Sequence, residues 1–347
     1  MRTVLTFLFA FGAGIAVMLW MPGHMPSSAR SAQANAGKPA VVAIAGVASA
    51  AAGSTEVIEE DGHALDNWPD SAPSPEQVIY AQPRMLGDAL ARLTPRVAGK
   101  PNLYLLTFAG DGGEDVFRNE AEYAAQLFTT RFGPTTHSLL LENNPATLAT
   151  HSLASWSNLD AALGGLSRIM QPDQDILLLY VATHGSEDHT LLVDMDPLPL
   201  DQISAQDLAG ILARHHFKWK VLVINACYSG GFVPPLRGPG TMILTAARRD
   251  RSSFGCGSES DITYFGHAWL EDALNYTDNF VDAFKRARDE IAAWEKRDKL
   301  TPSEPQIDMG IGIEQQLALW RNGFKPGPAV PFKPAAPARA DSSSAHQ

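Results

Sequence analysis

The chain has 347 residues, of which 45% are hydrophobic and 19% charged, a balance that is ample for one globular domain of moderate size with appendages. Its formal net charge of −11 and its pI near 5.3 argue against nucleic-acid binding, and the sequence contains no block rich in Lys and Arg. We therefore exclude nucleic acid as a partner.

The N-terminal segment is apolar. Val4 to Met21 is an uncharged run that follows Arg2 and precedes a stretch rich in Pro, Ser and Ala. Its length favours an uncleaved membrane anchor, whereas Ala32-Gln33-Ala34 offers the small residues of a signal-peptide cleavage site. Both interpretations place the protein in the cell envelope, either anchored in the inner membrane and facing the periplasm or secreted to the periplasm.

Composition divides the chain into five segments. Apolar residues at near-helical spacing from Val78 to Leu93 predict an amphipathic helix that leads into the folded domain. The linker before it and the tail after the domain are rich in Ala, Pro and Ser, which is typical of chain without a packed core. The expected segments are the signal peptide or anchor (1–21), the linker (22–74), the amphipathic lead-in (75–100), the folded domain (101–325) and a disordered tail (326–347).

The first half of the domain alternates strands and helices, which predicts an α/β fold with a parallel sheet. We interpret Asp111 and its acidic neighbours as a tight turn with acids near a helix N-terminus, because their spacing does not fit a calcium-binding loop. The expected elements are a strand at 103–108, a turn at 110–115, a helix at 114–132, a strand at 136–141, a helix at 152–170 and a strand at 175–183.

Two of the buried strands end in residues with complementary chemistry. Asp175 to Thr183 is followed by His184 and Gly185, and Val221 to Asn225 is followed closely by Cys227. Apolar runs without alternation are typical of strands buried on both faces of a parallel sheet, and ligand sites lie beyond the carboxyl ends of such strands. A thiol attacks carbonyl groups as its thiolate, and a nearby imidazole can take or hold its proton. We therefore expect acyl-transfer chemistry, with an oxyanion held by the N–H groups of Gly185 and Cys227.

The second half of the domain continues the alternation. Ser204 and Asp207 form a predicted capping box at the start of a helix. The loop that follows the next strand is rich in Arg and Ser, and loops after parallel strands line pockets. The expected elements are a small hairpin arm at 190–193, a helix at 204–215, a strand at 242–246, a loop at 248–260, a helix at 278–294 and a last strand at 305–309.

Three segments, taken together, resemble the legumain-type cysteine peptidases, which are relatives of the caspases. His184-Gly185 after one buried strand and Ala226-Cys227 after a later one look like the catalytic dyad of that family. The stretch NACYSGG is similar to the legumain pattern, although the Gln that precedes Ala-Cys in caspases is absent. Residues 108–128 resemble the segment that carries an Arg into the substrate pocket, which here is Arg118. Residues 245–269 resemble the segment whose Ser-Ser pair lines that pocket, here Ser252 and Ser253.

This resemblance is collinear from Asn102 to Ile313 and implies both a fold and an activity. The implied fold is a caspase-hemoglobinase-like three-layer sandwich, with a mostly parallel sheet of about six strands flanked by helices. The implied activity is that of a cysteine endopeptidase acting on peptides or proteins, without a metal or organic cofactor. Cys227 and Cys256 could instead form a disulfide in an oxidising compartment, which would silence the nucleophile; the resemblance implies that Cys256 is a structural thiol.

The departures from the family bear on specificity. Legumains recognise Asn through an Arg and two acidic residues, and the acids stand where this chain has Asn225 and His267. Arg118, together with Ser253 and His267, would suit a carboxylate better than an amide, which predicts cleavage after Asp or Glu in preference to Asn. The Asn that orients the catalytic His in legumains is matched by Val116, so the sequence contains no residue of that kind at this position.

Three functions are compatible with the sequence. The favoured one is an envelope cysteine endopeptidase with Cys227 as nucleophile and His184 as base and acid. The second is a transamidase that passes the acyl group to an amine, as relatives that attach lipid anchors do. The third is a catalytically silent binding protein tethered at the envelope. The sequence does not indicate the oligomeric state.

Overall fold

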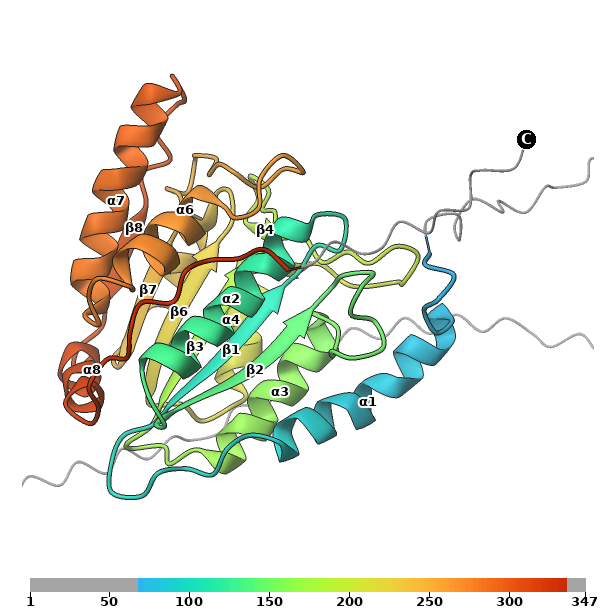
Figure 1. The fold of residues 1–347 in the computed structure, drawn as a ribbon, viewed down its shortest axis with the longest axis horizontal. Helices are drawn as coiled ribbons and strands as arrows, with labels where there is room; N and C mark the ends of the chain where they lie inside the picture. Colours follow the sequence, from blue (N-terminus) through green and yellow to red (C-terminus); the bar gives the residue numbers. More distant parts are fainter. Residues whose placement is uncertain (1–67, 336–347) are drawn as a thin grey trace, which may run out of the picture. The chain divides into compact units, whose positions relative to one another are not determined.

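The computed structural model describes residues 68–335 of the chain (Figure 1). The predicted signal peptide or anchor (1–21) lies outside the described residues, as do most of the linker and the end of the tail. Among residues 68–335, no helix is both long enough and apolar enough to cross a membrane.

A six-stranded sheet with the order β2-β1-β3-β6-β7-β8 forms the centre of the domain. Neighbouring strands are parallel except for β8, which pairs antiparallel with β7. Every residue of β1 and β3 is buried, which explains why both strands read as continuous apolar runs. The predicted sheet of about six mostly parallel strands is confirmed. The strands are β1 (Leu103–Ala109), β2 (Thr136–Glu142), β3 (Ile176–Ala182), β6 (Trp219–Asn225), β7 (Thr241–Thr245) and β8 (Gln306–Met309).

Helices cover both faces of the sheet, as Figure 1 shows. Because side chains alternate along a strand, Leu105 and Leu178 join the core on one face, and Leu106 and Leu179 join the core on the other. The predicted three-layer sandwich is therefore confirmed. The first face is covered by α2 (Asp115–Arg131), the π-helical η3 (His267–Ala273), α7 (Phe280–Arg297) and α8 (Ile313–Arg321), and the second by α1 (Pro75–Ala91), α3 (Trp156–Ile169), α4 (Ala205–Ala213) and α5 (Val233–Leu236).

Local sequence signals set the starts of these helices. Ser74 and Gln77 form a capping box with Pro75 in the first turn, so α1 begins where its pattern predicts. Ser204 and Asp207 form the predicted capping box of α4. The hairpin arm predicted near Thr190 is present as a short antiparallel ribbon. The remaining short elements are β4 (Thr190–Leu191), β5 (Ile203–Ser204), η2 (Ser229–Phe232) and α6 (Tyr264–Gly266).

The segment 326–335 packs against α2 rather than leaving the domain, and Figure 1 shows it crossing that helix in dark red. Arg131 donates to the carbonyl of Gly327 at 2.6 Å, and the Tyr123 hydroxyl donates to the carbonyl of Val330 at 2.7 Å. Val330 is buried. The predicted disorder from Pro326 is therefore wrong as far as Ala335, because a Pro-rich composition does not reveal backbone hydrogen bonds to a helix.

Candidate active site

The ends of β3 and β6 lie level at the carboxyl edge of the sheet. Ala182 pairs with Asn225, and the N–H of Thr183 donates to the carbonyl of Asn225 at 3.2 Å. His184 and Cys227 each follow this register pair by two residues, so the predicted base and nucleophile stand on neighbouring chain segments. A methyl group on Gly185 would lie 2.3 Å from the carbonyl oxygen of Cys227, which shows how closely these segments approach.

Several hydrogen-bond donors surround the sulfur of Cys227. The N–H of Ser253 lies 3.3 Å from Sγ, and the Ser253 hydroxyl lies 3.6 Å from it. Hydrogen bonds from Cys256, Ser253 and Ser252 lower the pKa of the Cys227 thiol to about 5, although burial opposes this shift. The same contact with Cys227, together with burial, raises the pKa of Cys256. Both thiols are free, and the opposite directions of the two pKa shifts favour the thiolate on Cys227 over Cys256.

This lowered pKa predicts an unusual pH dependence of alkylation. A thiol with a pKa of about 5 is mostly thiolate above pH 5, so the reaction with iodoacetamide should rise through that pH and level off by about pH 6–7. Replacing Cys256 with Ala should move the midpoint to higher pH, because the largest stabilising hydrogen bond is lost. The rate measured from pH 4 to 10, with the modified residue identified by peptide mapping, checks both expectations. A wild-type midpoint near the ordinary cysteine value of about 8.5 would contradict them.

His184 is held from two sides. Its Nε2 lies 3.5 Å from Oδ2 of Asp111, and the edge of its ring meets Phe117 at a centroid distance of 5.0 Å. A cavity of about 620 Å³ adjoins the imidazole and is lined by the β3–β4 connection, including Glu187 and Asp188. Asp111 was predicted only as a turn residue. The signal that could have identified it is its position two residues beyond β1, the same offset that His184 and Cys227 have from their strands.

Arg118 lies in the interior of the domain rather than in an open pocket. It is 1% exposed, its Nη1 donates to Oδ1 of Asn144 at 2.9 Å, and its Nη2 lies 3.6 Å from Oδ1 of Asp115. Asn144 follows β2, so the guanidinium is directed toward the β2 end of the sheet. The contacts seen for Arg118 therefore do not assemble the predicted pocket with Ser253 and His267.

The other predicted binding residues have different surroundings. Ser253 contacts the nucleophile, as described above. His267 is partly exposed on η3, where its Nε2 lies 3.5 Å from Glu271 and 3.4 Å from Asp272, and its ring lies against Trp294. The imidazole of His267 is therefore already in contact with two carboxylates. Of the three residues predicted to recognise a substrate carboxylate, Ser253 contacts the sulfur of Cys227.

Asn225 belongs to a buried network centred on Glu120. The Asn225 amide donates to Glu120 and, at 2.8 Å, to the Thr263 hydroxyl. Tyr180 donates to Glu120 at 2.6 Å, and Thr263 donates through its hydroxyl at 2.7 Å and its N–H at 3.2 Å. Burial raises the pKa of Glu120 above its usual range. A fully buried carboxylate thus fixes the strand end that carries Cys227, a role that the sequence did not suggest.

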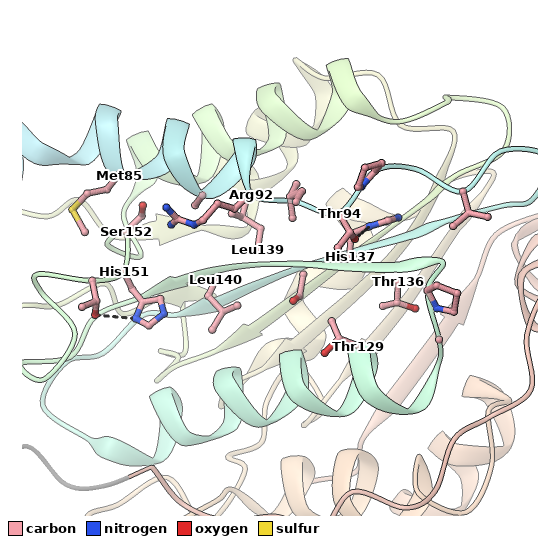
Figure 2. A pocket seen from close by; sticks show the side chains of 18 residues that line it. Met85, Arg92, Thr94, Thr129, Thr136, His137, Leu139, Leu140, His151 and Ser152 are labelled. Carbon is pink, nitrogen blue, oxygen red and sulfur yellow. Dashed lines mark hydrogen bonds between the residues drawn. The ribbon is translucent and has the colours of Figure 1, made fainter.

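A second cavity lies away from this edge. Figure 2 shows it beside the edge strand β2, between the C-terminal part of α1 and helix α2, with a volume of about 720 Å³. None of the predicted site residues lines it. The labelled residues that line this second cavity are Met85, Arg92, Thr94, Thr129, Thr136, His137, Leu139, Leu140, His151 and Ser152.

In residues 68–335, no cluster of three or more His, Cys, Asp or Glu side chains is placed to hold a metal ion.

Comparison with known families agrees with this geometry. The family model described as Peptidase C13 family, the legumain family, matches residues 157–312. Residues 157–312 of the chain are therefore similar to the legumain family of peptidases. The matched region contains His184, Cys227 and Ser253, whereas Asp111 and Arg118 precede it. The crystal structure of Caspase-1 from Spodoptera frugiperda is a similar solved structure, with 12% sequence identity, 63% of this chain and 90% of that chain covered, and a TM-score of 0.42. No curated protein matches the chain.

Proposed function

We propose that the protein is a cysteine endopeptidase in which Cys227 is the nucleophile and His184 the general base and acid. The observation that carries this proposal is the level position of the two residues beyond the register pair Ala182–Asn225, with a thiol whose pKa is lowered to about 5. The similarity of residues 157–312 to a peptidase family supports peptides or proteins as substrates.

The proposed reaction uses groups at this edge of the sheet. The Cys227 thiolate attacks the carbonyl carbon of the scissile bond, and the oxyanion is held by the N–H groups of Gly185 and Cys227. Neither N–H donates to another backbone group within residues 68–335, so both are available to a substrate oxygen. His184 gives a proton to the leaving amine, the C–N bond breaks, and a thioester to Cys227 remains. Water, deprotonated by His184, then releases the acid and restores the thiolate.

The preferred side chain before the scissile bond depends on the charges beside Cys227. An acidic preference would need a cation beside Cys227, but the contacts of Arg118 with Asn144 and Asp115 and those of His267 with two acids do not support that pocket. Preference for Asp or Glu therefore remains a prediction from the sequence resemblance, and it requires Arg118 to exchange its present partners for substrate. The location in the cell envelope is likewise proposed from Val4–Met21 alone.

Hydrolysis of fluorogenic peptides varied at the residue before the cleaved bond tests this function. The full-length chain is compared with Cys227→Ala, which should lose essentially all turnover because it lacks the thiolate that attacks the scissile carbonyl. Turnover that survives Cys227→Ala would reject the proposed nucleophile. If turnover appears only when a primary amine is added, the enzyme is a transamidase. If Cys227 also fails to react with a peptide electrophile, the protein is a binding protein without catalysis.

A further inference from the structure

Three neighbouring strands carry a polar side chain at the same height. Ala109 of β1 pairs with Ala182 of β3, and Ala182 pairs with Asn225 of β6. Asp111, His184 and Cys227 each lie two residues beyond this row. Because β3 is the middle strand of the three, His184 follows the strand that lies between those leading to Asp111 and to Cys227.

The carboxylate of Asp111 is fixed in place. The residue is buried, and its Oδ1 accepts a hydrogen bond from the N–H of Gly113 at 2.9 Å, which leaves Oδ2 directed at Nε2 of His184. The surrounding backbone is bridged to the segment after β4: Gly112 donates to the carbonyl of Asp194 at 3.0 Å, and Asp194 donates to that of Gly110 at 2.8 Å. The carboxylate is therefore oriented before a substrate arrives.

The residue that matches the orienting Asn of legumains is Val116, and its side chain cannot orient the imidazole. Val116 is apolar, is 1% exposed, and belongs to the core between α2 and the sheet. Phe117 restricts the ring by its edge contact but offers no hydrogen-bond acceptor. Asp194 is a further carboxylate near Asp111, and burial and the charge of Asp111 raise its pKa. Asp111 is thus the group that contacts the ring nitrogen.

We propose that Asp111 is a positioning residue that accepts the Nε2–H of His184 and thereby directs Nδ1 toward Cys227 and the leaving group. This inference rests on the proposed function. A carboxylate at Nε2 selects one tautomer and stabilises the imidazolium form. In the acylation step, the C–S bond forms, the C–N bond breaks, and the proton on Nδ1 moves to the departing amine. Asp111 contacts no reacting atom.

The first test compares substrates that do and do not need that proton. Asp111→Ala, Asp111→Asn and the control Asp194→Asn are assayed with an amide and a 4-nitrophenyl ester of the same acyl group. Because kcat/KM reports acylation, Asp111→Ala should lower kcat/KM for the amide about 10–100-fold and that for the ester less than about threefold. Asp111→Asn should recover part of the loss, since its oxygen can still accept a hydrogen bond, and Asp194→Asn should resemble wild type. Equal losses on both substrates would indicate a merely structural role and would overturn the proposal.

A second test does not depend on turnover. Two-bond 15N–1H spectra, with His184 assigned by comparison with His184→Gln, report which nitrogen of the neutral ring carries the proton. We expect Nε2–H in wild type and in Asp194→Asn, and a larger share of Nδ1–H in Asp111→Ala. If wild type shows the Nε2–H form but hydrolyses no peptide, the proposed function fails while the positioning contact stands. A neutral wild-type ring that carries its proton on Nδ1 would refute the positioning contact itself.

Discussion

Replacement of Glu120 by Gln is expected to lower the free energy of unfolding by about 3 kcal/mol, the largest stability effect expected of a single polar substitution in this domain. The carboxylate is completely buried and accepts hydrogen bonds only, from Tyr180, Asn225 and Thr263. In Gln, an NH2 group would replace one of the two carboxylate oxygens and would face hydrogen-bond donors. Donor–donor repulsion in the interior would then replace hydrogen bonds. Thermal denaturation should show a Tm about 6–12 °C lower.

Two further variants separate this network from a general effect of charge. Tyr180→Phe removes one donor and leaves the others, so it should cost only about 1 kcal/mol. Glu259→Gln removes a carboxylate from an exposed loop position and should change stability by less than about 0.5 kcal/mol. If Glu120→Gln is as stable as Glu259→Gln, the network does not hold the domain together.

The effect of Glu120 on activity follows from its contact with Asn225. This residue ends β6 two positions before Cys227, and its amide is anchored by Glu120 and Thr263. Loss of the anchor would let the strand end move, and displacement of a nucleophile by about 1 Å can cost about 100-fold in rate. Asn225 therefore contributes to the site by fixing the end of β6. The sequence resemblance had placed this residue among those that bind substrate.

The strands could be predicted from the sequence because their burial leaves a simple pattern. The runs at 103–108 and 175–183 correspond closely to β1 and β3, since strands buried on both faces have no room for polar side chains. The direction of β8 could not be predicted, because an antiparallel edge strand and a parallel one have the same side-chain period. The packing of 326–335 on α2 was missed because it depends on main-chain hydrogen bonds that any residue type can make.

The chemistry at the sheet edge was predictable only where residue type itself is informative. A Cys and a His that end buried strands indicate a site, whereas Asp111 in a Gly-rich turn has a common structural explanation. The direction of Arg118 could not be read from the sequence, because residues one apart on a helix point about 100° away from each other. Arg118 and Glu120 are two positions apart, about 200° around α2, so the first meets Asn144 while the second lies in the buried network.

Substitution of Ala for Gly185 is expected to reduce kcat/KM for peptides about 100- to 1,000-fold with a modest loss of stability. The added methyl would lie 2.3 Å from the carbonyl oxygen of Cys227 and 3.1 Å from the Cβ of Ala226. Backbone cannot yield as a flexible side chain can, so the segments that carry the base and the nucleophile must separate. The N–H of residue 185 is retained in this variant, so the loss reports geometry rather than a missing oxyanion donor.

The matched control for this substitution is Gly210→Ala on α4. A methyl there would meet no atom within 4 Å, and Ala in a helix interior is favoured over Gly, so this variant should gain about 0.5–1 kcal/mol and keep its activity. Both variants are compared by peptide hydrolysis and thermal denaturation. Full activity in Gly185→Ala would mean that the segments bearing His184 and Cys227 are not held as closely as the register of β3 and β6 requires. Loss of activity with a destabilisation of about 1–3 kcal/mol would show that their separation, rather than unfolding, limits the reaction.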